Sequence, residues 1–138
     1  SLAAGLEAEL ALAADDSAAA LDGLRRAVAA QEAEAGADRE WGALSFFRYR
    51  LAELLEAGGD SAAAAATLGA IEIRSLGSLL LDARAQLALG RALEAIGEMG
   101  QAAAAYVTAA RWWSQAEPAF AEEVERARAG ITRTQPQE

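Results

Sequence analysis

One short pattern occurs three times in this chain, and the repetition restricts the fold more than any other feature. A few turn-forming residues followed by a run of alanines open the stretches 15–28, 59–71 and 100–113. Asp16 and Asp60 lie 44 residues apart, and the related turns LEAGG and LEAIG place Gly59 and Gly97 38 residues apart. Both spacings are close to the roughly 34 to 47 residues of helix-pair repeats, whose hairpins must stack to bury their apolar faces. The sequence therefore predicts stacked helical hairpins.

The composition indicates that nearly all of the chain is helical. Ala, Leu, Glu and Arg dominate the 138 residues, and only two prolines occur, Pro118 and Pro136. These four abundant residue types are strong helix formers, whereas the residues favoured in strands are scarce. We expect an all-α fold: a right-handed stack of about three antiparallel hairpins with a C-terminal capping helix. We expect a single domain over residues 1–133. It would consist of three units at about 2–35, 40–73 and 79–115 and a closing helix at 118–132, followed by a disordered tail at 134–138.

Turn residues separate two helices within each unit. Gly59 and Gly97 can take the left-handed conformation that ends a helix, and Asp60 or Ser61 can accept hydrogen bonds from the first free N–H groups of the next helix. The first unit has Asp15, Asp16 and Ser17 at this place but no glycine. Its turn is therefore predicted from the cap alone.

Charge and missing residue types exclude several classes of function. The net charge of −9 argues against binding a nucleic-acid duplex. The absence of Cys and His removes thiolate and imidazole chemistry, including zinc and haem ligation by those side chains, and no metal or other cofactor is expected. The uncharged run 61–71 is far shorter than the roughly 20 apolar residues of a membrane span. Acidic pairs such as Glu122 with Glu123 point apart on a helix, so we expect no enzyme.

Residues 83–110 resemble a tetratricopeptide repeat. The positions that match that family's pattern of leucine, small, turn and aromatic residues are Leu89, Gly90, Leu93, Gly97, Ala102, Tyr106 and Ala109. The second unit keeps a weaker version at Ala52, Leu55, Gly59, Ala64 and Leu68. The repeat spacings exceed the family's usual period, and its proline is displaced to Pro118.

The C-terminal part is similar to the ends of tetratricopeptide regions in large bacterial regulatory proteins, including serine/threonine kinases. The similarity covers the sequence AYVTAARWWSQAEPAFAEEVERARAGI. It implies a sensory or scaffolding module of a larger protein, and because no initiator Met is present we expect an excised piece, with a cytoplasmic location. No kinase motif occurs in these residues.

By the same resemblance, an extended protein or peptide segment would bind along the concave face formed by the first helix of each pair. The residues implied there are Phe46, Tyr49, Glu53, Arg84, Leu87 and Arg91. The two arginines are seven residues apart and so share a helix face, where they could clamp a carboxylate or phosphate. The alternative is that they pair with Glu53, Glu56 or Glu94 and that the aromatics belong to the core.

Two further functions remain open alongside peptide recognition. The uncapped first unit could pair with another copy to give a homodimer, or Phe46, Tyr49 and Leu87 could line a pocket for a small molecule. Of the adjacent Trp112 and Trp113, one is expected in the core and the other as an exposed anchor at an interface.

Overall fold

The computed structural model describes residues 2–33, 43–71, 79–113 and 121–135, and within these ranges every regular element is an α-helix. The expectation of an all-α chain is thereby confirmed for the described residues. The segments expected to join the units, 34–41 and 74–79, lie almost wholly outside them, as do Pro118 and residues 136–138. The helices are α1 (Leu2–Ala13), α2 (Ser17–Ala33), α3 (Ala43–Ala57), α4 (Ser61–Gly69), α5 (Leu79–Ala95), α6 (Met99–Trp113) and α7 (Ala121–Thr134).

The three turns inside the hairpins have one shared conformation. Each contains a single residue in the left-handed region: Asp15 at φ 59°, Gly59 at φ 83° and Gly97 at φ 84°. The next backbone N–H in each turn donates to the carbonyl oxygen five residues earlier, at 2.9 Å in all three turns. This is the Schellman pattern that ends a helix. The left-handed residues lie 44 and 38 residues apart, the same spacings that the repeated sequence predicts.

In each of the first two hairpins, an aspartate side chain caps the N-terminus of the second helix. The Asp16 carboxylate accepts from the Ala19 N–H and the Asp60 carboxylate from the Ala63 N–H, each at 3.0 Å. The sequence left Asp60 and Ser61 as candidates for the cap of α4, and the structure shows that Asp60 is the cap.

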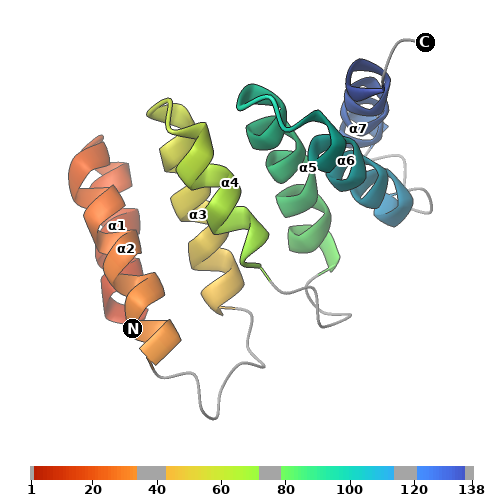
Figure 1. Ribbon diagram of the computed structural model, residues 1–138. Coiled ribbons are helices and arrows are strands. Elements are labelled where there is room, and N and C mark those ends of the chain that lie inside the picture. The colour runs from red at the N-terminus through yellow and green to blue at the C-terminus, as the bar shows by residue number, and fades with distance from the viewer. Residues whose placement is uncertain (1, 34–42, 72–78, 114–120, 136–138) are drawn as a thin grey trace.

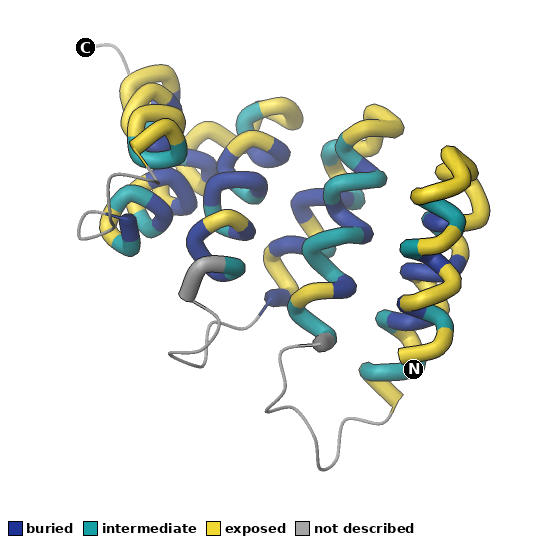
Figure 2. Tube along the Cα trace, turned by 180° about the vertical axis from the view of Figure 1, so that it is seen from behind, coloured by how far each residue is buried: buried dark blue, intermediate teal, exposed yellow. Residues whose placement is uncertain are grey.

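The hairpins lie side by side in chain order. Figure 1 shows α1 with α2, α3 with α4 and α5 with α6 as successive pairs, followed by α7 at the C-terminal end. Between pairs, α2 contacts α3 and α4 contacts α5, while α7 packs on α6 and also on α5. Figure 2 shows the buried residues concentrated where neighbouring helices face each other.

Small residues allow these helices to approach closely. A Cβ atom added at Gly90 of α5 or at Gly130 of α7 would lie only 2.6 Å from the ring of Tyr106, which is fully buried. In the first hairpin, Gly23 of α2 packs on Ala8 of α1. The alanine runs have the same role, since Ala64, Ala65, Ala102 and Ala105 are all buried.

The last helix extends past its expected end. The sequence predicts a closing helix over 118–132 with the tail starting at 134, but α7 continues to Thr134. The Thr134 side chain is buried, and its hydroxyl donates to the Gly130 carbonyl oxygen at 2.8 Å. Burial and this hydrogen bond keep the last turn helical.

Candidate functional site

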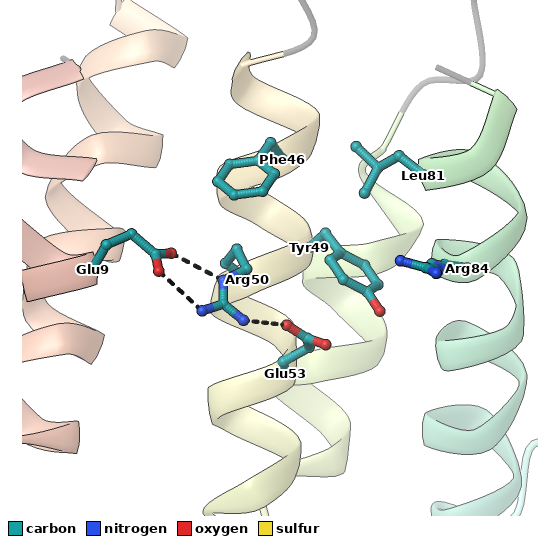
Figure 3. Close-up of a pocket in the computed structure, with 7 residues that line it drawn as sticks. All are labelled: Glu9, Phe46, Tyr49, Arg50, Glu53, Leu81 and Arg84. Atoms are coloured by element: carbon teal, nitrogen blue, oxygen red, sulfur yellow. Dashed lines mark hydrogen bonds and ion pairs between the residues drawn. The ribbon is translucent and has the colours of Figure 1, made fainter. Parts of the chain in front are cut away.

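A hollow in the described part of the chain opens between α1, α3 and α5. Its volume is about 490 Å³, and its lining residues are Glu9, Phe46, Tyr49, Arg50, Glu53, Leu81 and Arg84. The close-up in Figure 3 shows these side chains converging from the three helices. A volume of this size falls within the roughly 300 to 1,000 Å³ of ligand pockets.

Helical spacing explains why α3 supplies most of the lining. Phe46, Tyr49, Arg50 and Glu53 are related by steps of three and four residues, which places them on one face of the helix. On α5, Leu81 and Arg84 are three residues apart and share a face in the same way. The lining on each helix is therefore a local consequence of the sequence, whereas the meeting of the helices is not.

Arg50 is held in place by two carboxylates. Its Nε and Nη2 atoms donate to the two carboxylate oxygens of Glu9 at 2.9 and 3.1 Å, and its Nη1 atom donates to Glu53 Oε2 at 2.8 Å. The hydrogen bonds that Arg50 donates to Glu9, and secondly to Glu53, raise the pKa of its guanidinium above its already high value. Such a two-pronged contact fixes the orientation of both groups, here joining α1 to α3.

Arg84 differs from Arg50 in having no such partner. It is exposed, and within the described residues it forms no ion pair and no hydrogen bond. Figure 3 shows its side chain directed toward Tyr49. The hollow thus contains one guanidinium that is already bound by carboxylates and a second one that is accessible to a ligand.

The aromatic side chains supply the apolar part of the hollow. Phe46 is 43% exposed although it is large and apolar, and its ring meets the ring of Phe47 edge to face, with centroids 5.9 Å apart. Burial first, and then the nearby Glu53 carboxylate, raise the pKa of Tyr49, although Arg84 and Arg91 act in the opposite direction. The Tyr49 phenol therefore keeps its proton at neutral pH and can donate a hydrogen bond.

Four of the six residues expected on the concave face line this hollow: Phe46, Tyr49, Glu53 and Arg84. Leu87 lies in the core at 5% exposure, away from the hollow. Arg91 is exposed on α5 and pairs with Glu56 across to α3 at 3.6 Å, which is one of the pairings considered as an alternative. The structure therefore separates the two arginines, since only Arg84 reaches the hollow.

The two tryptophans occupy different environments. Trp113 is 3% exposed and belongs to the core, whereas Trp112 is half-buried and packs against it. Nothing in the described residues accepts a hydrogen bond from the Trp113 indole Nε1. Neither tryptophan is among the large exposed apolar side chains of the described chain.

Three lining residues were not foreseen from the sequence. Arg50 is four residues after Phe46 and Leu81 three before Arg84, so extending each helix face by one turn would have found both. No local signal identifies Glu9, which lies 41 residues before Arg50 in the chain.

The site shows no arrangement for bound metal. Among the described residues there is no group of three or more acidic side chains that could hold a metal ion.

None of the described helices is both long enough and apolar enough to cross a bilayer.

Comparison with protein-family models, with curated proteins and with solved structures found no match to this chain.

Proposed function

We propose that this chain is a non-catalytic recognition module, a tetratricopeptide-like stack that binds an extended protein or peptide segment in the hollow between α1, α3 and α5. Three features support it: the repeated hairpin turns, the resemblance of residues 83–110 to that family, and the convergence of side chains from three successive units. The resemblance of the C-terminal part supports a role in a larger bacterial regulatory protein, in the cytoplasm.

The single observation that carries the proposal is the accessible Arg84 guanidinium beside exposed aromatic surface. The Arg50 charge is already compensated by Glu9 and Glu53, so Arg84 is the cation that a ligand can engage. Arginine binds carboxylates through paired hydrogen bonds. Phe46 and Tyr49 add apolar surface with few rotatable bonds, which favours binding because little side-chain entropy is lost.

The ligand that fits this chemistry is a peptide with an aromatic or aliphatic side chain close to a carboxylate. The apolar side chain would contact Phe46, Tyr49 and Leu81, and the carboxylate would accept hydrogen bonds from Arg84. The Tyr49 hydroxyl can donate to a peptide carbonyl oxygen. Glu9 and Glu53 stay paired with Arg50 and disfavour a second carboxylate at the α1 side of the hollow.

A displayed library of random peptides tests the proposal. Peptides enriched on the chain are synthesised, and their affinity is measured by fluorescence anisotropy for the original protein and for Arg84→Gln, Tyr49→Ala and Arg126→Gln. We expect Arg84→Gln to weaken binding about tenfold or more, because a hydrogen bond to a charged group contributes about 1.5 to 3 kcal/mol. Arg126→Gln removes the same charge from α7, far from the hollow in the fold, and should leave the affinity unchanged.

Circular dichroism of each variant shows whether the helices remain intact. Enriched peptides that bind equally well to Arg84→Gln and Tyr49→Ala would place the site elsewhere. A library that yields no peptide binding below about 1 mM would also contradict peptide recognition at this hollow.

A further inference from the structure

The first helices of the three hairpins, α1, α3 and α5, run in the same direction (Figure 1). Between α3 and α5, Glu56 pairs with Arg91, and the Arg84 charge acts on Tyr49. Both pairs join residues that are 35 positions apart in the chain. Two parallel helices give such a constant offset, so residues of α3 and α5 that are 35 apart lie at the same level.

The first two of these helices can be matched in the same way. The ring of Phe47 lies directly against Gly5, and Glu9 accepts hydrogen bonds from Arg50. The contacts follow one another in the same order on α1 and on α3, four residues apart on the first helix and three on the second. The level of Phe46 on α3 is therefore close to that of Gly5 on α1.

Each of the three helices has an apolar side chain one turn before a charged one. On α1, Leu6 is three residues before Glu9 and shares its helix face, and it is 67% exposed. On α3 and α5 the corresponding residues all line the hollow. The pairs are Leu6 with Glu9, Phe46 with Arg50 and Leu81 with Arg84.

These pairs form two rows across the helices, an apolar row (Leu6, Phe46 and Leu81) and a charged row (Glu9, Arg50 and Arg84). Phe46 and Leu81 are 35 residues apart and so lie at one level, and Leu6 directly follows Gly5, which matches that level on α1. Figure 3 shows the α3 and α5 members of the apolar row at one level and all of the charged row at the next.

The charge around the hollow is unevenly distributed between the helices. On α1 and α3, Glu9 and Glu53 place two carboxylates around the single guanidinium of Arg50, a net charge of −1, and both carboxylate side chains are 39% exposed. On α5, Arg84 contributes a charge of +1 to the hollow. A ligand that crosses the hollow therefore meets an excess of negative charge at α1 and α3 and positive charge at α5.

We propose that the ligand is an extended peptide segment that crosses α1, α3 and α5, with apolar residues alternating with polar ones and with opposite charges at its two ends. This inference rests on the proposed function and adds the pattern of the ligand to it. Side chains of an extended chain point alternately to two sides, so one set meets the apolar row and the other meets the charged row. The basic end lies near Glu9 and Glu53, and the acidic end lies on Arg84.

The dimensions of the fold set the length of this segment. Axes of packed helices are about 8 to 10 Å apart, so the path from α1 to α5 is about 16 to 20 Å. An extended chain advances about 3.3 Å per residue, so about six residues cover this path.

Two designed peptides of identical composition test the pattern. Acetylated and amidated Lys-Leu-Ser-Leu-Ser-Leu-Glu alternates, whereas Lys-Leu-Leu-Ser-Ser-Leu-Glu keeps the end charges but breaks the alternation. By fluorescence anisotropy of labelled peptides, we expect the alternating peptide to bind about tenfold more tightly. Replacing its Lys by Glu should weaken binding about fivefold, because the new carboxylate faces those of Glu9 and Glu53.

Leu6→Ser tests whether α1 contributes to the apolar row. We expect this substitution to weaken binding of the alternating peptide about fivefold, because one apolar contact is lost. Val107→Ser is the matched control, since Val107 is also exposed, at 44%, but lies on α6. It should bind within about twofold of the original chain, and circular dichroism shows whether both variants keep their helices.

The outcomes separate this inference from the proposed function. Equal affinity for the two peptides, or equal effects of Leu6→Ser and Val107→Ser, would overturn the alternating pattern. If Arg84→Gln still weakened binding of both peptides, the hollow would remain a peptide site and the proposed function would stand. Failure of both peptides to bind below about 1 mM would also overturn the pattern, and selection from the random library would then decide the proposed function separately.

Discussion

Tyr106 is the residue at which three helices meet. It lies on α6, and its ring is enclosed between Gly90 of α5 and Gly130 of α7, where a side chain on either glycine would collide with it. Its hydroxyl donates to Glu94 Oε2 at 2.7 Å, and Glu94 also accepts two hydrogen bonds from Arg133 of α7, at 2.8 and 3.1 Å. The buried phenol is thereby satisfied, and α7 is joined to α5 through one carboxylate.

The pKa values of this cluster make its contribution depend on pH. Hydrogen bonds from Arg133 first and Tyr106 second lower the pKa of Glu94 below its ordinary value, so its contribution to stability is present at neutral pH and is lost as the pH falls through the lowered pKa. Burial first and Glu94 second raise the pKa of Tyr106 to about 12. The Tyr106 contribution is therefore complete below about pH 10 and lost as the pH rises toward 12.

We expect Glu94→Gln to lower the free energy of unfolding at pH 7 by about 1 kcal/mol, a reduced value for charged hydrogen bonds because Arg133 is half-exposed. Urea unfolding at pH 7 and at pH 3 measures this, and the difference from the original chain should shrink at the lower pH. Glu125→Gln is the control, since Glu125 pairs with Arg128 on the surface of α7 and should matter little. An effect of Glu94→Gln that is independent of pH would contradict the role of its charge.

At the scale of the element, each hairpin depends on one left-handed turn residue. Glycine meets this requirement at Gly59 and Gly97, but the first hairpin uses Asp15 at φ 59°. A side chain in this conformation costs energy that glycine avoids, although Asp tolerates it better than most residues. The carboxylate of Asp15 also lies near the negative end of α1. The first turn is therefore built like the other two but is less favourable.

Asp15→Gly should accordingly stabilise the chain by about 1 kcal/mol. Asp16→Gly makes the same change at the neighbouring residue, but there it removes the cap on Ala19, and we expect a loss of a few tenths of a kcal/mol. Thermal and urea unfolding of the two variants provide the comparison. Stabilisation by both changes, or by neither, would show that the conformation of Asp15 carries no strain.

At the scale of the whole molecule, the first and last helices differ in how much of their surface is buried. The C-terminal end is covered by α7, which is charged on its outer side and packs on α6 and α5. In α1, Leu2, Leu6 and Leu10 are exposed, and only Gly5 and Ala8 are buried. In a row of hairpins each unit is stabilised by its neighbours, so a unit with one uncovered side is the least protected.

We expect native-state hydrogen exchange to show this gradient. In dilute protein the amides of α1 should exchange faster than those of α6, which has five buried residues including Tyr106 and Trp113. Exchange followed by mass spectrometry of peptides from each helix measures the order. Uniform protection from α1 to α7 would indicate that the chain opens as a single cooperative unit.

The helical part of the fold could be predicted because its causes are local. Turn residues, caps and helix-forming residues act over a few positions, so the all-α class and the spacing of the three hairpin turns follow from the sequence alone. That Phe46, Tyr49 and Glu53 share one face of α3 was predictable for the same reason. Leu87 could not be placed in this way. It lies only about 60° around α5 from Arg84, yet the packing of α5 against its neighbours buries Leu87 in the core while Arg84 stays exposed.

The sequence by itself determined which segments are helical, where the hairpins turn, and which functional chemistries its missing residue types rule out. Only the tertiary structure decided that Glu9 would meet Arg50, that Arg91 would pair with Glu56 while Arg84 stayed accessible, and that Glu94 would join Tyr106 to Arg133. The physical reason is the distance along the chain over which each kind of interaction acts. Hydrogen bonding within a helix and its turns spans about five residues, whereas contacts between helices depend on how each helix is rotated against its neighbours.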